Sequence, residues 1–155
     1  MLPGKSDQEI PSGFEIIGDI AHLNLSKSVY DQRYEVGQVV LDKNPNLRTV
    51  VCKIGAIQSE FRYYDLDCIA GEKDNYETIQ IEDKVRFKVD ISKMYWCSKL
   101  STERNRMIKE YLKDGEVLCD MMCGIGPLAV KAAVKRPKLK VVCNDLNPEG
   151  IVCCN

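Results

Sequence analysis

The chain has 155 residues, of which 45% are hydrophobic and 29% charged, and its formal net charge is −1 at pH 7. This length suffices for one ordinary hydrophobic core or two small ones. The balanced charge excludes a globally basic protein, although nucleic-acid binding needs only a local basic face. The sequence contains no run of about 18 apolar residues and therefore predicts no membrane-spanning helix.

The sequence holds eight cysteines and a single histidine, His22. Because no Cys-x-x-Cys pair occurs, we expect neither a metal centre nor a disulfide framework. Most of the cysteines stand in apolar runs, where a free thiol packs as a small hydrophobic group. We therefore expect reduced thiols in a soluble intracellular protein without a signal peptide. The expected compartment is the cytoplasm, with the nucleus and the mitochondrial matrix as alternatives.

The first third of the chain alternates short apolar runs with turns. Residues 1–12 are polar and are predicted to form a flexible arm. Apolar runs at residues 14–17 and 20–23 predict two strands that meet at a turn. Residues 30–41 have an irregular apolar face and predict a helix, and residues 48–57 form the clearest strand.

The middle of the chain continues this pattern. We predict a strand over residues 60–69 and a hairpin from residues 78–81 and 85–91 through Glu82-Asp83-Lys84. A helix follows from Ser98, with hydroxyl side chains as N-caps and Glu103 in its first turn, and it stops before Asp114-Gly115. We expect residues 13–113 to form an α+β domain with this linker helix at its end.

Residues 114–155 have a different organisation. An apolar run at 117–119 ends in Asp120 and a turn containing Gly124 and Gly126, followed by an alanine-rich helical pattern. A second apolar run, at 139–143, leads to Asp145. Pro127 fits the first turn of the helix, where its missing N–H costs nothing. The order strand, glycine turn, helix, strand and acid is typical of a Rossmann-like nucleotide fold.

The glycine turn predicts a nucleoside ligand. Glycines let a ligand lie against the backbone, and Asp145 stands where a carboxylate can accept hydrogen bonds from two ribose hydroxyls. The turn lacks the third glycine of a dinucleotide site, and Asp120 would repel a pyrophosphate. A cationic ligand such as S-adenosylmethionine suits it better. The alternative is an α/β unit with no cofactor, since Gly-x-Gly alone is weak evidence.

Several motifs also carry a family resemblance. The segments Asp120-Met-Met-Cys-Gly-Ile-Gly-Pro127 and Asn144-Asp-Leu-Asn-Pro148 resemble motifs I and II of class I methyltransferases. The match is to the archaeal and eukaryotic tRNA (guanine-N1)-methyltransferases, which act on the guanosine 3′ of the anticodon. Upstream, Glu60-Phe-Arg62 and Met94-Tyr-Trp-Cys-Ser-Lys-Leu-Ser-Thr-Glu103-Arg104 extend the resemblance, which covers nearly the whole chain from about Gly13.

The resemblance implies two catalytic residues. Glu103 would accept the N1 proton of guanine, and Arg62 would stabilise the negative charge on O6. The plainer alternatives are a helix-terminal carboxylate and a solvated strand arginine.

The resemblance also implies a set of cofactor contacts. Tyr95 would lie near the methionine part of S-adenosylmethionine, Asp120, Gly124 and Gly126 near its amino-acid end, Asp145 on the ribose and Pro148 at the adenine.

The predicted fold class is α/β, with an N-terminal α+β domain followed by the first βαβ part of a Rossmann-like methyltransferase domain. Only two strands of that second sheet precede Asn155, so we expect this chain by itself to be inactive. The expected enzyme is a monomeric tRNA methyltransferase that binds tRNA and no metal. The alternatives are a non-catalytic tRNA-binding remnant and a transferase of the wybutosine pathway.

Overall fold

A computed structural model describes residues 13–54 and 65–153. Its first sheet has the strand order β1-β2-β3-β4. The strands are β1 (Glu15–Ile17), β2 (Ile20–Leu23), β3 (Thr49–Ile54) and β4 (Asp65–Gly71). Strands β1 and β2 are antiparallel around Gly18, whose φ of 58° suits a tight turn. Strand β3 runs parallel to β2 and antiparallel to β4.

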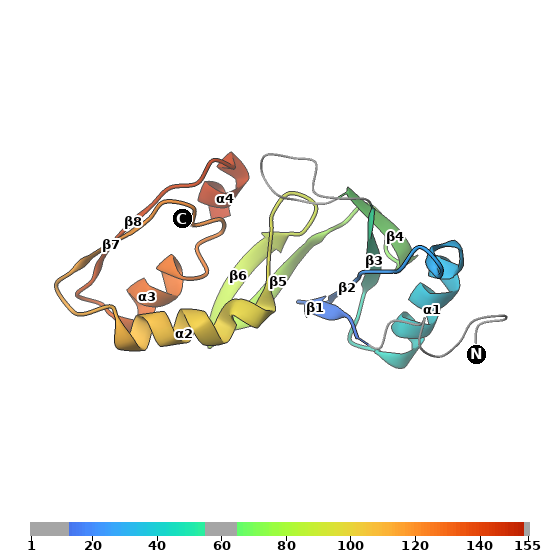
Figure 1. The fold of residues 1–155 in the computed structure, drawn as a ribbon, viewed down its shortest axis with the longest axis horizontal. Coiled ribbons are helices and arrows are strands. Elements are labelled where there is room, and N and C mark those ends of the chain that lie inside the picture. The colour runs from blue at the N-terminus through green and yellow to red at the C-terminus, as the bar shows by residue number, and fades with distance from the viewer. Residues whose placement is uncertain (1–12, 55–64, 154–155) are drawn as a thin grey trace.

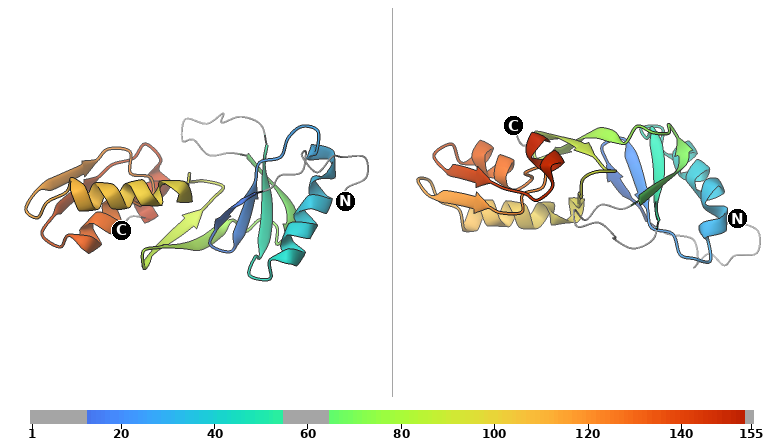
Figure 2. Two further views of the ribbon diagram at one scale, coloured as in Figure 1. Left: turned by 60° about the horizontal axis from the view of Figure 1, so that its bottom comes forward. Right: turned by 90° about the horizontal axis from the view of Figure 1, so that it is seen from above.

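The parallel step from β2 to β3 requires a crossover, which η1 (Tyr30–Gln32) and α1 (Arg33–Lys43) provide. In Figure 2 this helix covers one face of the sheet. At Gly37 a Cβ atom would lie 2.8 Å from Ile69 Cγ1, so the absent side chain lets the helix approach β4 closely. Buried Val36, Val50 and Cys52 lie in the core between them. The predicted helix at residues 30–41 is confirmed, with a 3-10 first turn.

The predicted hairpin is also present, as β5 (Glu77–Glu82) and β6 (Val85–Asp90). Its turn is shorter than expected, because Glu82 belongs to β5 and only Asp83 and Lys84 connect the strands. Both turn residues have positive φ, 51° and 69°, as a type I′ turn requires. The inward side chains of β6 join a core that also contains residues of the first sheet and of the glycine turn: Ile17, Ile20, Val51, Phe87, Val89, Ile91, Met94, Trp96 and Ile125.

The linker helix begins differently from the prediction. Residues Ser98–Leu100 form a 3-10 turn, η2, and α2 runs over Ser101–Glu110. The N-cap residue is Leu100, and no side chain caps this helix end. The predicted hydroxyl N-cap is therefore wrong: the 3-10 turn leads straight into the helix, and the Ser98 hydroxyl instead bonds the indole N–H of Trp96 at 2.9 Å.

The last part consists of β7 (Val117–Asp120), α3 (Ala129–Lys135), β8 (Lys140–Cys143) and α4 (Pro148–Cys153). Strands β7 and β8 are parallel, with Asp120 opposite Cys143. Helix α3 begins at Ala129, so the placement of Pro127 in its first turn is wrong. Gly124 and Gly126 have φ of 56° and 74°, values that a right-handed helix cannot contain. The short helix α4 was not predicted.

Figure 1 shows the elements in an elongated arrangement, with β1–β4 and α1 at one end and β7, β8, α3 and α4 at the other. The hairpin and α2 connect the two ends. The structure confirms the predicted α/β class, with an N-terminal α+β part and a βαβ unit after it. Among the described residues, no helix is long and apolar enough to cross a membrane.

Candidate functional site

The glycine turn and Asp145 are in direct contact. The backbone N–H of Gly124 donates a hydrogen bond to Asp145 Oδ2 at 2.7 Å, although the two residues are 21 positions apart. The N–H of Asn147 donates to the other carboxylate oxygen, Oδ1, at 2.9 Å. Each oxygen of a carboxylate can accept a second hydrogen bond. Asp145 therefore shapes the turn and still has acceptor capacity for ligand hydroxyls.

Asp120 lies beside this pair at the carboxyl end of β7. Its carbonyl accepts the N–H of Asn144 at 2.9 Å, and the Asn144 carbonyl accepts the N–H of Cys123 at 3.0 Å. Burial is the main cause that raises the pKa of Asp120; a bond from the Met122 N–H opposes the rise, and the charge of Asp145 adds to it. Two carboxylates thus meet at one turn, which favours a cationic ligand over an anionic one.

We expect the substitution Asp120→Asn to raise the melting temperature of the ligand-free protein near neutral pH. Asparagine removes the disfavoured charge and keeps an oxygen for the Met122 N–H. Because folding raises the pKa of Asp120, ionisation favours the unfolded chain, so the gain should shrink as the pH falls through the folded pKa. Thermal unfolding between about pH 4 and 7 measures the difference in melting temperature from wild type. The control is Asp114→Asn, which removes a carboxylate at an exposed position. An Asp120→Asn protein that melts no higher than wild type at pH 7 would contradict the charge argument.

Two residues of this site were not predicted. Asn147 is 5% exposed, and its side-chain amide donates to the Lys93 carbonyl at 2.7 Å and to Met94 Sδ at 3.2 Å. It therefore joins the Asp145 loop to the segment before η2. At Gly150 a Cβ would lie 2.7 Å from the carbonyl oxygen of Gly124, so α4 rests on the glycine turn. The Asn147-Pro148 pair was the available signal in the sequence.

Pro148 and Tyr95 are each next in sequence to residues that contact the glycine turn or its loop. Pro148 is the first residue of α4, where its fixed φ is favourable. Tyr95 follows Met94, whose methyl carbon lies 3.9 Å from the position of a Cβ at Gly124. The Tyr95 side chain is 49% exposed and lines a small cavity together with His22 and Lys53. The cofactor roles of both residues stay predictions.

Glu103 lies in the first turn of α2, apart from the contacts described above. Its carboxylate accepts two hydrogen bonds from Arg106, at 2.6 and 2.8 Å. These bonds lower the pKa of Glu103, so the side chain is ionised near neutral pH, and the same bonds make it a weaker base while they persist. Arg62, the second predicted catalytic residue, lies outside the described residues. Both catalytic roles stay predictions.

A groove of about 680 Å³ lies on the first sheet and shares His22 and Lys53 with the small cavity that Tyr95 lines. Burial, with the nearby charge of Lys53, lowers the pKa of His22 to about 4, so the histidine is neutral at pH 7. The positive charge of the groove comes from Lys53 and Lys99. The carboxylate in it, Glu15, accepts the N–H of Ser98 at 2.7 Å. The groove is lined by Gly13, Phe14, Glu15, Ile16, His22, Leu23, Asn24, Lys53, Ser98 and Lys99.

Comparison of the chain with known proteins identifies its family. Residues 78–154 match the TRM5/TYW2 methyltransferase domain, and residues 1–74 match the TYW2 N-terminal domain. The chain belongs to the TRM5/TYW2 methyltransferase family. A tRNA (guanine(37)-N(1))-methyltransferase of Saccharomyces cerevisiae is 44% identical over 150 residues, which are 97% of this chain and 30% of that protein. The resemblance inferred from the motifs is thereby confirmed.

Solved structures of family members share the fold. The structure of aTrm5 in complex with tRNALeu has a TM-score of 0.80 at 30% identity, covering 96% of this chain and 43% of that one. Trm5 of Methanocaldococcus jannaschii in complex with adenosine has a TM-score of 0.76 at 28% identity, covering 95% of this chain and 43% of that one. The chain spans about a third of the length of the curated relatives it matches.

Proposed function

We propose that this chain carries the cofactor turn and the proton-accepting carboxylate of a tRNA (guanine-N1)-methyltransferase that uses S-adenosylmethionine. The bond between the Gly124 amide and Asp145 is the observation that supports this most directly. It joins the glycine turn to the carboxylate that would bind the ribose, and Asp120 beside them favours a cation, such as a sulfonium. The adenosine complex of a 28% identical relative supports a nucleoside as the ligand class.

The reaction assigns a role to each predicted residue. The methyl group would pass from the sulfonium sulfur of S-adenosylmethionine to guanine N1, and the electrons of the broken C–S bond would stay on sulfur. The N1 proton would pass to the carboxylate of Glu103, and Arg62 would donate hydrogen bonds to O6 as its negative charge grows. Asp145 would hold the ribose, and Asp120 and the glycine turn the amino-acid end. Tyr95 and Pro148 would contact the methionine and adenine parts.

We propose the groove lined by Phe14, Lys53 and Lys99 as a contact for tRNA. Lysines suit phosphates, and the exposed ring of Phe14 offers a face on which a base can stack. The tRNALeu complex of a 30% identical relative supports tRNA as the substrate class. The wybutosine-pathway alternative receives less support, since the curated relatives at 40–44% identity are named for guanine N1.

A methylation assay of the native full-length protein tests the proposal. The protein is incubated with S-adenosylmethionine and an unmodified tRNA transcript that carries guanosine directly 3′ of the anticodon. Nuclease digestion and mass spectrometry then quantify 1-methylguanosine. We expect one methyl group per transcript, and none on a transcript with adenosine at that position. Equal methylation of the two transcripts, or no methyl transfer at all, would rule the proposal out.

A further inference from the structure

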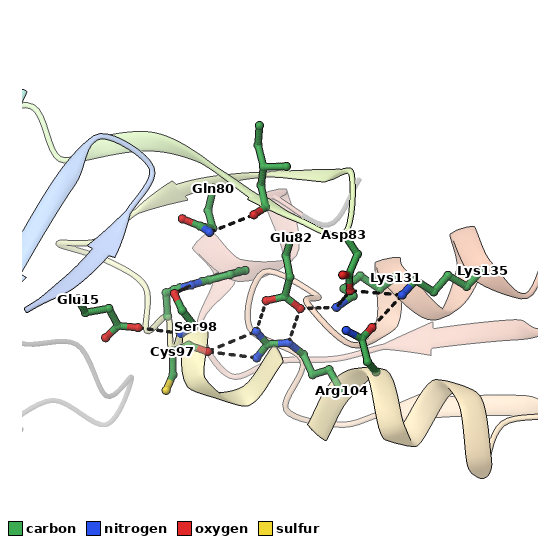
Figure 3. A network of polar contacts seen from close by, with 12 residues as sticks. Glu15, Gln80, Glu82, Asp83, Cys97, Ser98, Arg104, Lys131 and Lys135 are labelled. Carbon is green, nitrogen blue, oxygen red and sulfur yellow. Dashed lines mark hydrogen bonds and ion pairs between the residues drawn. The ribbon is translucent and has the colours of Figure 1, made fainter. Parts of the chain in front are cut away.

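A buried ionic network joins the hairpin turn to two helices (Figure 3). One carboxylate oxygen of Glu82 accepts Arg104 Nε–H at 3.0 Å and also pairs with Lys131 Nζ, and the other oxygen pairs with Arg104 Nη2. Asp83, the next residue, pairs with Lys131 at 2.5 Å and with Lys135 at 3.3 Å. Lys135 also donates to Asn105 Oδ1 at 2.8 Å.

The network is closed to solvent at its centre. The side chain of Lys131 is 0% exposed, and those of Glu82 and Arg104 are 7% and 9% exposed. Burial alone would raise the pKa of Glu82, but the bonds from Arg104 and Lys131 outweigh it and lower the pKa. Two negative charges, Glu82 and Asp83, face the two buried positive charges. A buried lysine requires such partners, because an ammonium group removed from water is otherwise strongly disfavoured.

Each of the two buried cations of the network, Arg104 and Lys131, adjoins one part of the proposed catalytic site. Arg104 directly follows Glu103 in α2, and its guanidinium also donates to the Cys97 carbonyl at 3.3 and 3.4 Å. Lys131 lies in α3, next to Val130, whose N–H donates to the carbonyl of Gly126 in the glycine turn at 2.8 Å. The Glu82 carboxylate therefore connects the helix of the predicted base to the helix that follows the cofactor turn.

We propose that Glu82 is a positioning residue for methyl transfer: by bridging Arg104 and Lys131 it holds Glu103 in a defined place relative to the glycine turn. The inference rests on the function proposed above. A surface ion pair would not hold two helices in a fixed relation, because solvent screens it and its long side chains remain mobile. Here the side chains of Glu82, Arg104 and Lys131 are buried, and Arg104 binds both carboxylate oxygens of Glu82. The contact between Arg104 and Glu82 therefore fixes the relative orientation of the two groups as well as their distance.

Two variants of the native full-length protein test this role. Glu82→Gln removes the bridging charge, and Arg104→Lys keeps a positive charge while losing the two-pronged bond. Because small displacements of a reacting group reduce rates steeply, we expect each to lower kcat for tRNA methylation by about 10- to 100-fold. For Arg104→Lys, the Kd of S-adenosylmethionine should stay within about twofold of wild type, since α3 and Lys131 keep their contact with Glu82.

The matched control is Glu77→Gln, which breaks an exposed ion pair with Lys88 (2.8 Å) on the same hairpin and should leave kcat unchanged. Melting temperatures are recorded for every variant, and rates are measured well below the lowest of them, so that all molecules are folded. If the network only stabilises the fold, Arg104→Lys will retain wild-type kcat under these conditions, and the positioning role is then wrong. A wild-type protein without methyl transfer would instead refute the proposed function.

Discussion

Replacement of Glu103 by glutamine in the native full-length protein is expected to lower kcat for tRNA methylation by about 10²- to 10⁴-fold. Glutamine has nearly the same shape but cannot take the N1 proton. The carboxylate of Glu103 is half exposed and ionised beside Arg106, so the wild-type side chain is in the unprotonated form that a general base requires. The Kd of S-adenosylmethionine should remain nearly unchanged, because no proposed cofactor contact involves Glu103. Single-turnover methylation and equilibrium binding measure the two quantities.

Glu110→Gln is a closely matched control for this experiment. Glu110 lies on the same helix, is similarly exposed, and accepts a hydrogen bond from the same arginine, Arg106, at 3.2 Å. The Glu110→Gln substitution removes one surface charge and one ion pair but no group with a proposed role in methyl transfer. We therefore expect kcat to stay within about twofold of wild type. A Glu103→Gln protein that is as active as the Glu110→Gln protein would remove Glu103 from the mechanism.

The second large effect is expected at Asp145, where alanine should weaken S-adenosylmethionine binding by at least about 100-fold. A hydrogen bond to a charged group contributes about 1.5–3 kcal/mol. Alanine would remove the two such bonds that Asp145 is proposed to accept from the ribose hydroxyls. The substitution also removes the acceptor for the Gly124 and Asn147 N–H groups, so the turn would lose its internal support. Isothermal titration of the native full-length protein with S-adenosylmethionine measures the affinity.

Two further variants separate ligand contacts from support of the turn. Asp145→Asn keeps one acceptor oxygen and should weaken binding less than alanine does. Glu149→Gln, in the same segment, changes only an exposed pair with Lys93 at 3.6 Å and should bind like wild type. If Asp145→Ala binds S-adenosylmethionine with wild-type affinity, the cofactor does not use this turn.

The site was predictable where its signals are local in the sequence. The sequence identifies the glycines of the turn and the acids after each strand, Asp120 and Asp145. In the structure the Gly124 N–H donates to Asp145 Oδ2 at 2.7 Å. The sequence does not identify Asn147 as a site residue, because an Asn-Pro pair is typical of many turns. Its role depends on Lys93 and Met94, which are 54 and 53 positions away.

The chain by itself determined its strands, its crossover helix and the order strand, glycine turn, helix, strand. These features follow from side-chain periodicity and from the backbone freedom of glycine, which act between near neighbours. The tertiary structure alone decided what Glu82, Arg104 and Lys131 do. In the sequence Lys131 stands among alanines and valines as an ordinary helical residue, yet it is fully buried against a carboxylate 49 positions away. Burial of a charged lysine requires that folding bring compensating charges to it. No local sequence pattern indicates the contact between Lys131 and Glu82.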